Sequence, residues 1–336
     1  MKKAALFAIA LASISGSASA ADLPTKALKA PPAPAFDPWD VAFGGAVMSD
    51  YVFRGVTQSN HQPSVTAYFE PRYNVNKDLQ LYIGTSTESI SFANRAAAEV
   101  DIYGGIRSTF GAFALDFGVW GYLYPGGHCA DGTTLTGGIP GGNVCPVSTD
   151  TIFLANNNVM KKDVSFFEVY GKGNYTVNDN WQFGVTEYYS PNFLNSGAWG
   201  DYASVTGKYT APSTVFGKSG VGMYVSGEFG RQWLGTSDAF YGVNSVLGNF
   251  SRGIPYASYN TWNLGVGFTY KTFTLDFRYS GTDLSKGNCN AFTSAFNASG
   301  TTNVTPINPG GAGTNWCGAA GIVKLSADLT AMTNLK

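Results

Sequence analysis

WNLGVGFTYKTFTLDFRYSG (residues 262–281) contains two alternating segments that are joined at Lys271 and Thr272. In each segment, apolar or aromatic residues alternate with glycine or polar residues, which is the period of a β-strand with two different faces. A turn centred on Lys271 and Thr272 sets three pairs opposite each other on the polar face: Thr269 and Thr274, Gly267 and Asp276, Gly265 and Arg278. Register and alternation agree, so the stretch predicts an antiparallel hairpin with one apolar face.

The same alternation recurs along the chain in segments of about ten residues. VTAYFEPRY (65–73), AEVDIYGGIR (98–107), FALDFGVWGYLY (113–124) and VGMYVSGEF (221–229) are examples. We expect twelve strands, at residues 39–48, 64–74, 79–88, 98–108, 113–124, 164–175, 181–190, 200–210, 221–231, 259–271, 273–283 and 319–329.

The connections between these segments alternate between short and long. Short turns lie at 75–78, 109–112, 177–180 and 271–272, with a longer one at 211–220, and the longest loops are 125–163, 232–258 and 284–318. This pattern is typical of periplasmic turns and extracellular loops. The sequence therefore predicts an all-β fold, an antiparallel transmembrane β-barrel of about 12 strands. An even number of strands would leave both termini in the periplasm of a Gram-negative cell, with the barrel in the outer membrane.

The composition agrees with a membrane barrel. Charged residues make up 13% of the chain, aromatic residues make up 15%, and there are 42 glycines. The charged share is about half of that in ordinary globular proteins. No apolar run of 18 residues follows the first 20, so no transmembrane helix is predicted. A soluble β-sandwich or periplasmic β-protein stays possible on these numbers.

The N-terminus predicts an exported protein. Residues 1–20 combine Lys2 and Lys3 with the apolar run AALFAIAL and the small residues ASA, as in a secretory signal peptide. Residues 21–38 are rich in proline and alanine and predict a periplasmic tether, so the barrel would comprise 39–336. Without the two lysines, 19 basic residues face 22 acidic ones, which argues against nucleic-acid binding.

Aromatic residues flank the predicted short turns on the apolar faces. Aromatic side chains at this position suit the headgroup zone of a membrane. Seven residues form the predicted aromatic girdle: Tyr73, Phe113, Tyr175, Trp181, Tyr209, Tyr270 and Phe273. Glu187 breaks the pattern, because it falls on the apolar face of its segment. A β-bulge or a place at the outer rim would explain it.

The predicted polar faces would line the lumen. Twelve charged side chains are the candidates for lining a pore: Glu70, Arg72, Glu99, Asp101, Arg107, Asp116, Glu168, Lys172, Lys208, Glu228, Asp276 and Arg278. Arg107 would lie opposite Asp116 across a turn at 111–112, as a cross-strand ion pair. A barrel of twelve strands lies between filled eight-stranded barrels and open sixteen-stranded ones, so we expect a narrow, water-filled pore. Alternatively, the charges merely pair and hydrate the interior.

The four cysteines lie in two predicted loops. Cys129 and Cys145 share one loop, and Cys289 and Cys317 share another, so two loop-local disulfides are the natural pairing in an exported protein. Other pairings are formally possible. A metal site is not expected, because the chain has no C-x-x-C pair and two histidines.

A surface enzyme is a further alternative to the channel, and it ranks below the others. His61, beside Asp50, and His128 are the histidines available for acid–base chemistry, and both lie in predicted loops. A G-x-S-x-G motif is absent. We therefore assign no catalytic residue, and solvated loop histidines are the simpler interpretation.

Five short stretches resemble the TorF family of porin-like proteins from proteobacteria: SDYVFRG (49–55), EVDIYGG (99–105), YLYPG (122–126), FEVYGKG (167–173) and EYYSP (187–191). The resemblance implies an outer-membrane barrel that acts as a pore, with no catalytic residues and no defined substrate. The end of the chain, LSADLTAMTNLK, departs from the terminal aromatic that outer-membrane barrels usually carry.

The sequence thus predicts a porin-like channel through which small hydrophilic solutes diffuse passively, without a cofactor. Arg54 would lie at the pore mouth. The expected partners are outer-membrane lipids, the barrel-assembly machinery and the solutes, and the oligomeric state is left open. A structural or adhesive surface barrel, closed by its disulfide loops, is the main alternative.

Overall fold

The computed structural model describes residues 37–127, 161–238, 253, 255–305, 308 and 310–334. The predicted signal peptide and nearly all of the predicted tether lie outside these ranges. Cys129, Cys145 and His128 lie outside them as well, so the disulfide expected between the first two is not addressed. Among the described residues, no helix has the length and apolar character needed to cross a membrane.

Twelve strands form the barrel wall, and each begins and ends within three residues of a predicted segment. They are β1 (Trp39–Met48), β4 (Ser64–Asn74), β5 (Leu79–Glu88), β6 (Glu99–Phe110), β7 (Phe113–Leu123), β8 (Phe166–Thr176), β9 (Trp181–Ser190), β10 (Gly200–Thr210), β11 (Val221–Leu234), β12 (Tyr259–Tyr270), β13 (Phe273–Thr282) and β14 (Ala320–Thr330). The predicted number of strands is confirmed.

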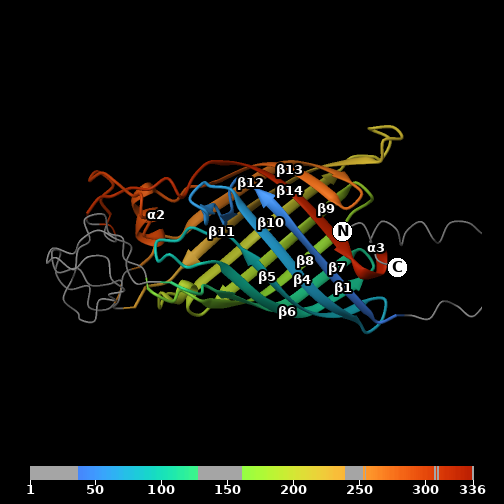
Figure 1. Cartoon of the computed structure of the whole chain (residues 1–336), viewed down its shortest axis with the longest axis horizontal. Coiled ribbons are helices and arrows are strands. Elements are labelled where there is room, and N and C mark those ends of the chain that lie inside the picture. Colours follow the sequence, from blue (N-terminus) through green and yellow to red (C-terminus); the bar gives the residue numbers. More distant parts are fainter. Residues whose placement is uncertain are drawn as a thin grey trace, which may run out of the picture. The chain divides into compact units, whose positions relative to one another are not determined.

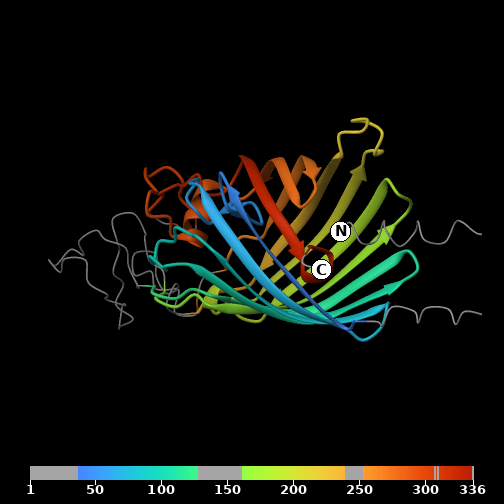
Figure 2. The same ribbon diagram turned by 45° about the vertical axis from the view of Figure 1, so that its right-hand side comes forward.

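The sheet closes on itself through its first strand. Every barrel strand pairs antiparallel with its neighbours in the chain, and β1 pairs with both β4 and β14. Gly45, for example, lies opposite Ala67 on one side and Ala327 on the other. The strands run obliquely around the barrel (Figures 1 and 2). Closure leaves no unpaired edge, which is what a β-structure in a lipid bilayer requires.

Apolar side chains predominate on the outward face of the wall. Large hydrophobic residues are exposed on it, including Ile83, Phe117, Val185, Val205, Leu264 and Leu325. The aromatic residues predicted at the short turns also face outward, and pairs of their rings touch across strands: Phe113 with Tyr175, and Trp181 with Tyr209. An exposed apolar belt with an aromatic girdle fits a lipid environment.

The hairpin of β12 and β13 has the predicted register. Gly265, Gly267 and Thr269 lie opposite Arg278, Asp276 and Thr274, all on the inner face. The expectation for Glu187 was partly wrong, because no bulge interrupts the ladder there. Glu187 pairs regularly with Gly171 and Ala203 and faces outward, three residues before the end of β9. Its position therefore follows from the regular pleat, and the side chain stays on the outer wall.

Several inward glycines make room for tyrosine rings on the next strand. A Cβ atom on Gly267 would lie 2.1 Å from the ring of Tyr224, and one on Gly84 would lie 2.4 Å from Tyr103. Any larger residue at these positions would force the ring aside. The glycines thus let the tyrosines lie flat against the inner wall instead of projecting across the lumen.

The two ends of the barrel differ. Helix α3 (Ala331–Asn334) follows β14 at the short-turn end, whereas the 3-10 turn η2 (Phe193–Asn195) and helix α2 (Lys286–Thr293) lie at the long-loop end (Figure 1). Ser285 caps α2 by accepting a hydrogen bond from the Asn288 amide. A small hairpin of β2 (Val52–Phe53) and β3 (Val56–Thr57) also lies at this end, and neither it nor the helices had been predicted.

The hydrophobic core lies among the loops at the long-loop end. It joins side chains from several loops and strand ends, including Val56, Phe92, Phe166, Phe193, Leu234, Leu284, Cys289 and Trp316. We call the described residues of 49–63 and 284–318 together the cap, because the two segments pack on each other here. A core of this kind holds the loops in a fixed arrangement over the end of the barrel.

Candidate functional site in the barrel lumen

All twelve charged residues predicted to line the lumen lie on the inner face of the wall. They fall into two groups along the barrel. Eight lie in the half next to the short turns: Glu70, Arg72, Arg107, Asp116, Lys172, Lys208, Asp276 and Arg278. The other four, Glu99, Asp101, Glu168 and Glu228, lie toward the long loops. Their inward position agrees with the alternation of the sequence, and their role in lining a conducting pore stays a prediction.

The short-turn half of the lumen contains a network of ion pairs. Arg107 Nη1 lies 2.7 Å from Glu70 Oε1, and Arg107 Nε lies 3.3 Å from Asp116 Oδ2, the partner expected from the sequence. Arg72 donates to Glu70 as well, at 2.6 Å. The side chain of Arg107 is 33% exposed and that of Arg72 is 22% exposed, although both point inward. Water therefore reaches this half of the lumen.

A second ion pair lies on the wall formed by β11 to β13. Arg278 Nη2 is 3.0 Å from Asp276 Oδ2, and Arg278 Nη1 donates to the Asn263 side-chain oxygen at 2.6 Å. Tyr224 donates its hydroxyl proton to Asp276 at 2.8 Å. The Lys208 ammonium lies over the Tyr224 ring, 4.5 Å from its centroid. Charges of both signs and tyrosine hydroxyls thus line the hydrated part of the lumen.

Arg54 sits at the tip of the β2–β3 hairpin and points into the barrel. Arg54 (φ 47°) and Gly55 (φ 78°) both have the left-handed backbone that a two-residue hairpin turn needs. Glycine is also required at position 55 by space, since a Cβ atom there would lie 2.8 Å from Thr282. This turn directs the guanidinium away from β1 and toward the opposite wall of the barrel.

The guanidinium of Arg54 binds two strands of that opposite wall. Its Nη1 and Nη2 donate to Glu168 of β8 at 2.8 and 2.7 Å, and Nη1 also donates to Gln232 of β11 at 3.0 Å. The rings of Tyr202 and Tyr188 lie 4.4 and 5.0 Å from its Cζ atom. The sequence placed Arg54 at the mouth, and the structure places its guanidinium against β8 and β11.

This contact is dry. The side chain of Arg54 is 5% exposed and that of Glu168 is 0% exposed. Burial alone would lower the pKa of the Arg54 guanidinium, but the neighbouring Glu168 carboxylate raises that pKa above its ordinary value. Arg54 therefore stays charged. Its two Nη atoms bind the two carboxylate oxygens of Glu168, which makes a bidentate ion pair in the long-loop half of the lumen.

Asp50 organises the loop that carries Arg54. It accepts hydrogen bonds from Thr57 and Ser59, and its Oδ2 lies 2.7 Å from His61 Nδ1. The pairing of Asp50 with His61 is the geometry considered for an acid–base pair. However, His61 Nε2 lies 2.9 Å from the carbonyl oxygen of Asn315, so both ring nitrogens face acceptors. These contacts at both nitrogens make the ring a link between two loops.

The two segments of the cap are bonded to each other. The Thr57 amide donates to the Trp316 carbonyl at 2.8 Å, and the Trp316 indole donates to Asn60 at 2.7 Å. Cys289 and Cys317 form a disulfide within the 284–318 segment. The disulfide ties α2 to the stretch that lies on the β2–β3 hairpin, so it supports the hairpin and Arg54 indirectly.

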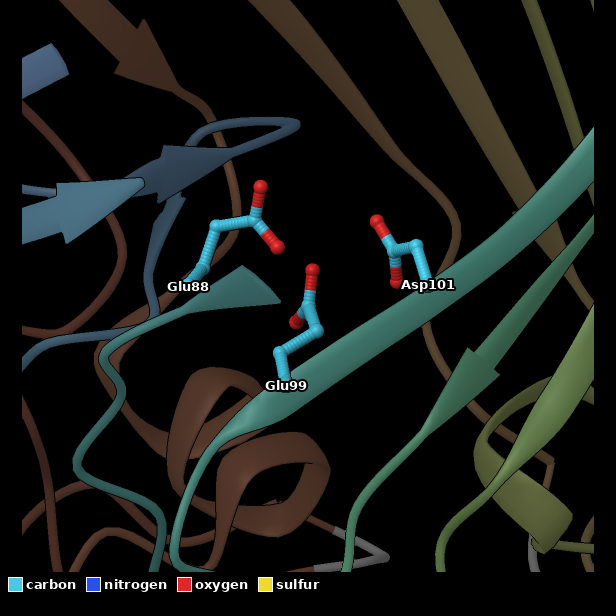
Figure 3. A group of neighbouring side chains, drawn as sticks. All are labelled: Glu88, Glu99 and Asp101. Atoms are coloured by element: carbon cyan, nitrogen blue, oxygen red, sulfur yellow. The ribbon is translucent and has the colours of Figure 1, made fainter. Parts of the chain in front are cut away.

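Three carboxylates meet beneath the cap (Figure 3). Glu88, Glu99 and Asp101 each place an oxygen within 4.8 Å of the others, and Glu99 and Asp101 are buried. Hydroxyl groups donate hydrogen bonds to two of these carboxylates: Tyr51 donates to Glu99 at 2.6 Å, and Ser86 donates to Asp101 at 3.1 Å. Burial, and then Glu99, raise the pKa of Tyr51 well above its ordinary value, so it stays a donor. The described residues with the spacing to hold a metal ion are these three.

Three lumen residues had not been singled out from the sequence. Glu88 and Gln232 lie on the inner faces of predicted strands or their extensions, so the alternation could have indicated both. Tyr51 lies in a loop, where side chains do not alternate between two faces as they do in a strand. Its role depends on the folding of residues 49–63 into the barrel end, and nothing local in the sequence signals that.

Residues 32–167 match the model of a protein family described as "Bacterial protein of unknown function (Gcw_chp)". The matched range contains SDYVFRG, EVDIYGG and YLYPG, which are three of the five stretches behind the resemblance to TorF. No curated protein matches the chain.

Similar solved structures include outer-membrane proteins. An outer membrane channel from Pseudomonas putida is 10% identical, with a TM-score of 0.41 and coverage of 87% of this chain and 95% of that one. The NanC porin is 8% identical, with a TM-score of 0.39 over 87% of this chain and all of its own. A loop-deletion mutant of OmpT, an outer membrane protein of Vibrio cholerae, is 12% identical, with a TM-score of 0.35, and covers 88% and 100%.

Proposed function

We propose that the protein is an outer-membrane channel for small hydrophilic solutes, closed at its long-loop end by the cap and by the Arg54–Glu168 ion pair. One observation carries this proposal: the arginine of the ion pairs near the short turns is partly exposed, whereas both side chains of the Arg54–Glu168 pair near the long loops are buried. Arg107 is 33% exposed, whereas Glu168 is 0% exposed. Solutes would pass by diffusion, without a cofactor, when the cap moves aside.

The proposed orientation places the short turns and both termini in the periplasm and the long loops outside the cell. In this orientation the hydrated half opens toward the periplasm, and the cap faces the exterior. The signal peptide and the TorF resemblance both support an outer-membrane location of this kind. Folding there would require the barrel-assembly machinery.

The lining of the hydrated half favours small polar solutes. It offers carboxylates, guanidinium groups and tyrosine hydroxyls close together, around Arg107 and around Arg278. A lumen with both signs of charge gives no strong barrier to either cations or anions, and it can hydrogen-bond neutral solutes. Ion pairing within the wall keeps the side chains against it.

A liposome-swelling assay tests the proposal. Wild-type protein and the Arg54→Ala variant are reconstituted, and swelling is followed in sugars and amino acids of increasing size. We expect slow swelling with wild type and several-fold faster swelling with Arg54→Ala. Lys77→Ala is the matched control, because Lys77 is an exposed basic residue at a short turn, and it should behave like wild type.

The outcome would also separate the channel from a structural barrel. If neither protein speeds swelling although both are folded, the barrel is not a diffusion channel. Folding is verified by the shift in gel mobility on heating that intact barrels show. A permanently closed surface barrel would then be the better interpretation.

A further inference from the structure

Two of the three carboxylates beneath the cap lie directly opposite each other across two strands. Glu88, at the end of β5, pairs with Glu99, at the start of β6, and both side chains face the lumen. Asp101 lies two residues further along β6, opposite Ser86 and on the same face. Like charges that lie opposite each other on one face of a sheet are destabilising. The fold therefore holds three acidic groups together although they repel one another.

The described residues supply no cation at ion-pair distance to these three carboxylates. The arginines in the lumen bind other acidic side chains, namely Glu70, Asp116, Glu168 and Asp276. Glu99 is only 2% exposed and Asp101 only 3% exposed, so water screens their charges little. A buried carboxylate is costly unless it is paired or bound to a metal ion.

One buried oxygen of the cluster has no hydrogen-bond donor among the described residues. Ser86 donates to Asp101 Oδ2 at 3.1 Å, but no group donates to Asp101 Oδ1. The Trp120 indole lies beside this carboxylate, yet its Nε1 atom is outside hydrogen-bond geometry. A buried polar atom without a partner is uncommon in proteins, and a bound ion can account for it. In Figure 3, the Asp101 carboxylate is turned toward those of Glu88 and Glu99.

The ligand atoms and their spacing restrict the cation. Carboxylate oxygens suit Ca²⁺ and Mg²⁺, whereas thiolate and imidazole groups suit most transition metals. Ca²⁺ binds oxygens at about 2.3–2.6 Å, so two of its ligands lie at most about 5 Å apart. The three carboxylates each place one oxygen within 4.8 Å of the others, which meets this limit. Mg²⁺ usually keeps several waters, which suits a buried cluster less well than the irregular, mostly protein-derived ligand sets that Ca²⁺ accepts.

We propose that Glu88, Glu99 and Asp101 bind one Ca²⁺ ion beneath the cap. The ion offsets two of the three negative charges and gives Asp101 Oδ1 a partner. It also fixes the Glu99 carboxylate, which accepts a hydrogen bond from Tyr51 of the cap at 2.6 Å. Since the same segment carries Arg54, the ion joins the wall of β5 and β6 to this part of the cap. The site goes beyond the proposed channel and does not depend on conduction.

Calcium binding to the detergent-solubilised full chain tests the site. The protein is stripped of metal with EDTA, and Ca²⁺ alone is then added while equilibrium dialysis counts the bound ions and thermal unfolding is followed. We expect one ion per chain, half-saturation at about 0.1–1 mM, as in extracellular calcium modules, and a higher melting temperature with Ca²⁺ than with EDTA. Mg²⁺ is added in a parallel titration and should bind more weakly.

Two variants and a control make the test specific. Asp101→Asn and Glu88→Gln each remove one charge and keep the shape, so each should weaken Ca²⁺ binding by about tenfold or more, equivalent to about 1.4 kcal/mol. In EDTA neither variant should melt below wild type, because each relieves repulsion, and this measurement separates a lost ligand from a failure to fold. Glu228→Gln is the matched control. Glu228 is an inward carboxylate outside the cluster, bound by Tyr202 and Asn263, so its variant should bind Ca²⁺ like wild type.

Three results would overturn the proposal. Wild-type protein that binds no Ca²⁺ would mean that the carboxylates share protons instead of a metal ion. Binding that both cluster variants retain at full strength would place the ion elsewhere on the barrel. Mg²⁺ that binds as tightly as Ca²⁺ would contradict the choice of calcium.

Discussion

The two halves of the lumen hold arginine–carboxylate pairs in opposite surroundings. Arg107 binds Glu70 and Asp116 near the short turns, where its side chain is 33% exposed. Arg54 binds Glu168 near the long loops, where the side chains are 5% and 0% exposed. The first pair lies within the wall, and the second joins a loop to the opposite wall. This difference supports the proposal that the lumen is open on the short-turn side and closed by the cap on the other.

This difference has energetic consequences. A hydrated ion pair contributes about 0–1 kcal/mol to stability, because water screens the charges. Removing one partner of a buried pair costs roughly 3–5 kcal/mol, because the other charge is left buried and unpaired. We therefore expect variants in the dry half to disturb the cap strongly and variants in the hydrated half to change conduction with little effect on stability.

The largest effect is expected for Arg54→Ala. The variant leaves the Glu168 carboxylate buried without its cation, so local opening of residues 49–63 should become easier by roughly 3–5 kcal/mol. Hydrogen exchange of the loop amides measures this free energy. Combining Arg54→Ala with Glu168→Gln should recover part of the loss. A change under 1 kcal/mol would mean that the pair does not hold the loop.

Removing the disulfide should have the next largest effect. Cys289→Ser with Cys317→Ser frees a segment that spans 28 positions in sequence. The chain-entropy model assigns about 3.6 kcal/mol to a disulfide that closes a loop of this length. Limited proteolysis of the cap should accelerate, and conductance should rise with it. Substitution is cleaner than a reductant because the chain also contains Cys129 and Cys145, and unchanged cleavage between residues 284 and 318 would contradict the expectation.

Alkaline pH should weaken the cap through Tyr51. Burial, and then the Glu99 carboxylate, raise the pKa of Tyr51 well above its ordinary value. An unfolded tyrosine loses its proton near pH 10 whereas folded Tyr51 does not, so stability is fully present below about pH 10 and is lost as the pH rises further. The slope is up to about 1.4 kcal/mol per pH unit. Thermal unfolding between pH 8 and 11 should show a steeper decline for wild type than for Tyr51→Phe, and equal slopes would contradict this.

The smallest effect on stability is expected for Arg107→Gln. The Arg107 side chain is 33% exposed and Glu70 keeps Arg72 as a partner at 2.6 Å, so the free energy of unfolding should change less than in Arg54→Ala. Loss of a positive charge from the lumen should shift ion selectivity toward cations. The reversal potential in a salt gradient measures this shift, with Lys77→Gln as a control outside the lumen. An unchanged reversal potential would place Arg107 away from the conduction path.

Much of the wall could be predicted because membrane barrels repeat one local rule. Alternating faces fix which residues point inward, so the register of Gly267 with Asp276 and the pair of Arg107 with Asp116 followed from short segments and their turns. Glu187 marks the limit of that rule. Its regular pairing shows that a charge can stand on the apolar face without a bulge.

The cap could not be predicted, because no local rule describes it. Arg54 and Glu168 are separated by 114 positions and meet because the hairpin reaches across a closed barrel. Helix α2 lies in a loop rich in glycine and asparagine, without an apolar period. The sequence analysis placed the disulfide residues in loops but could not show that the Cys317 stretch lies on the β2–β3 hairpin.

Single-channel recording in planar bilayers tests most directly whether the cap closes the lumen. Wild-type protein should remain mainly closed with rare openings. Arg54→Ala should open often, and its open conductance should match the conductance of the rare wild-type openings, because the hydrated half is unchanged. Wild-type protein that conducts continuously at the same level as Arg54→Ala would show that the ion pair between Arg54 and Glu168 does not close the channel.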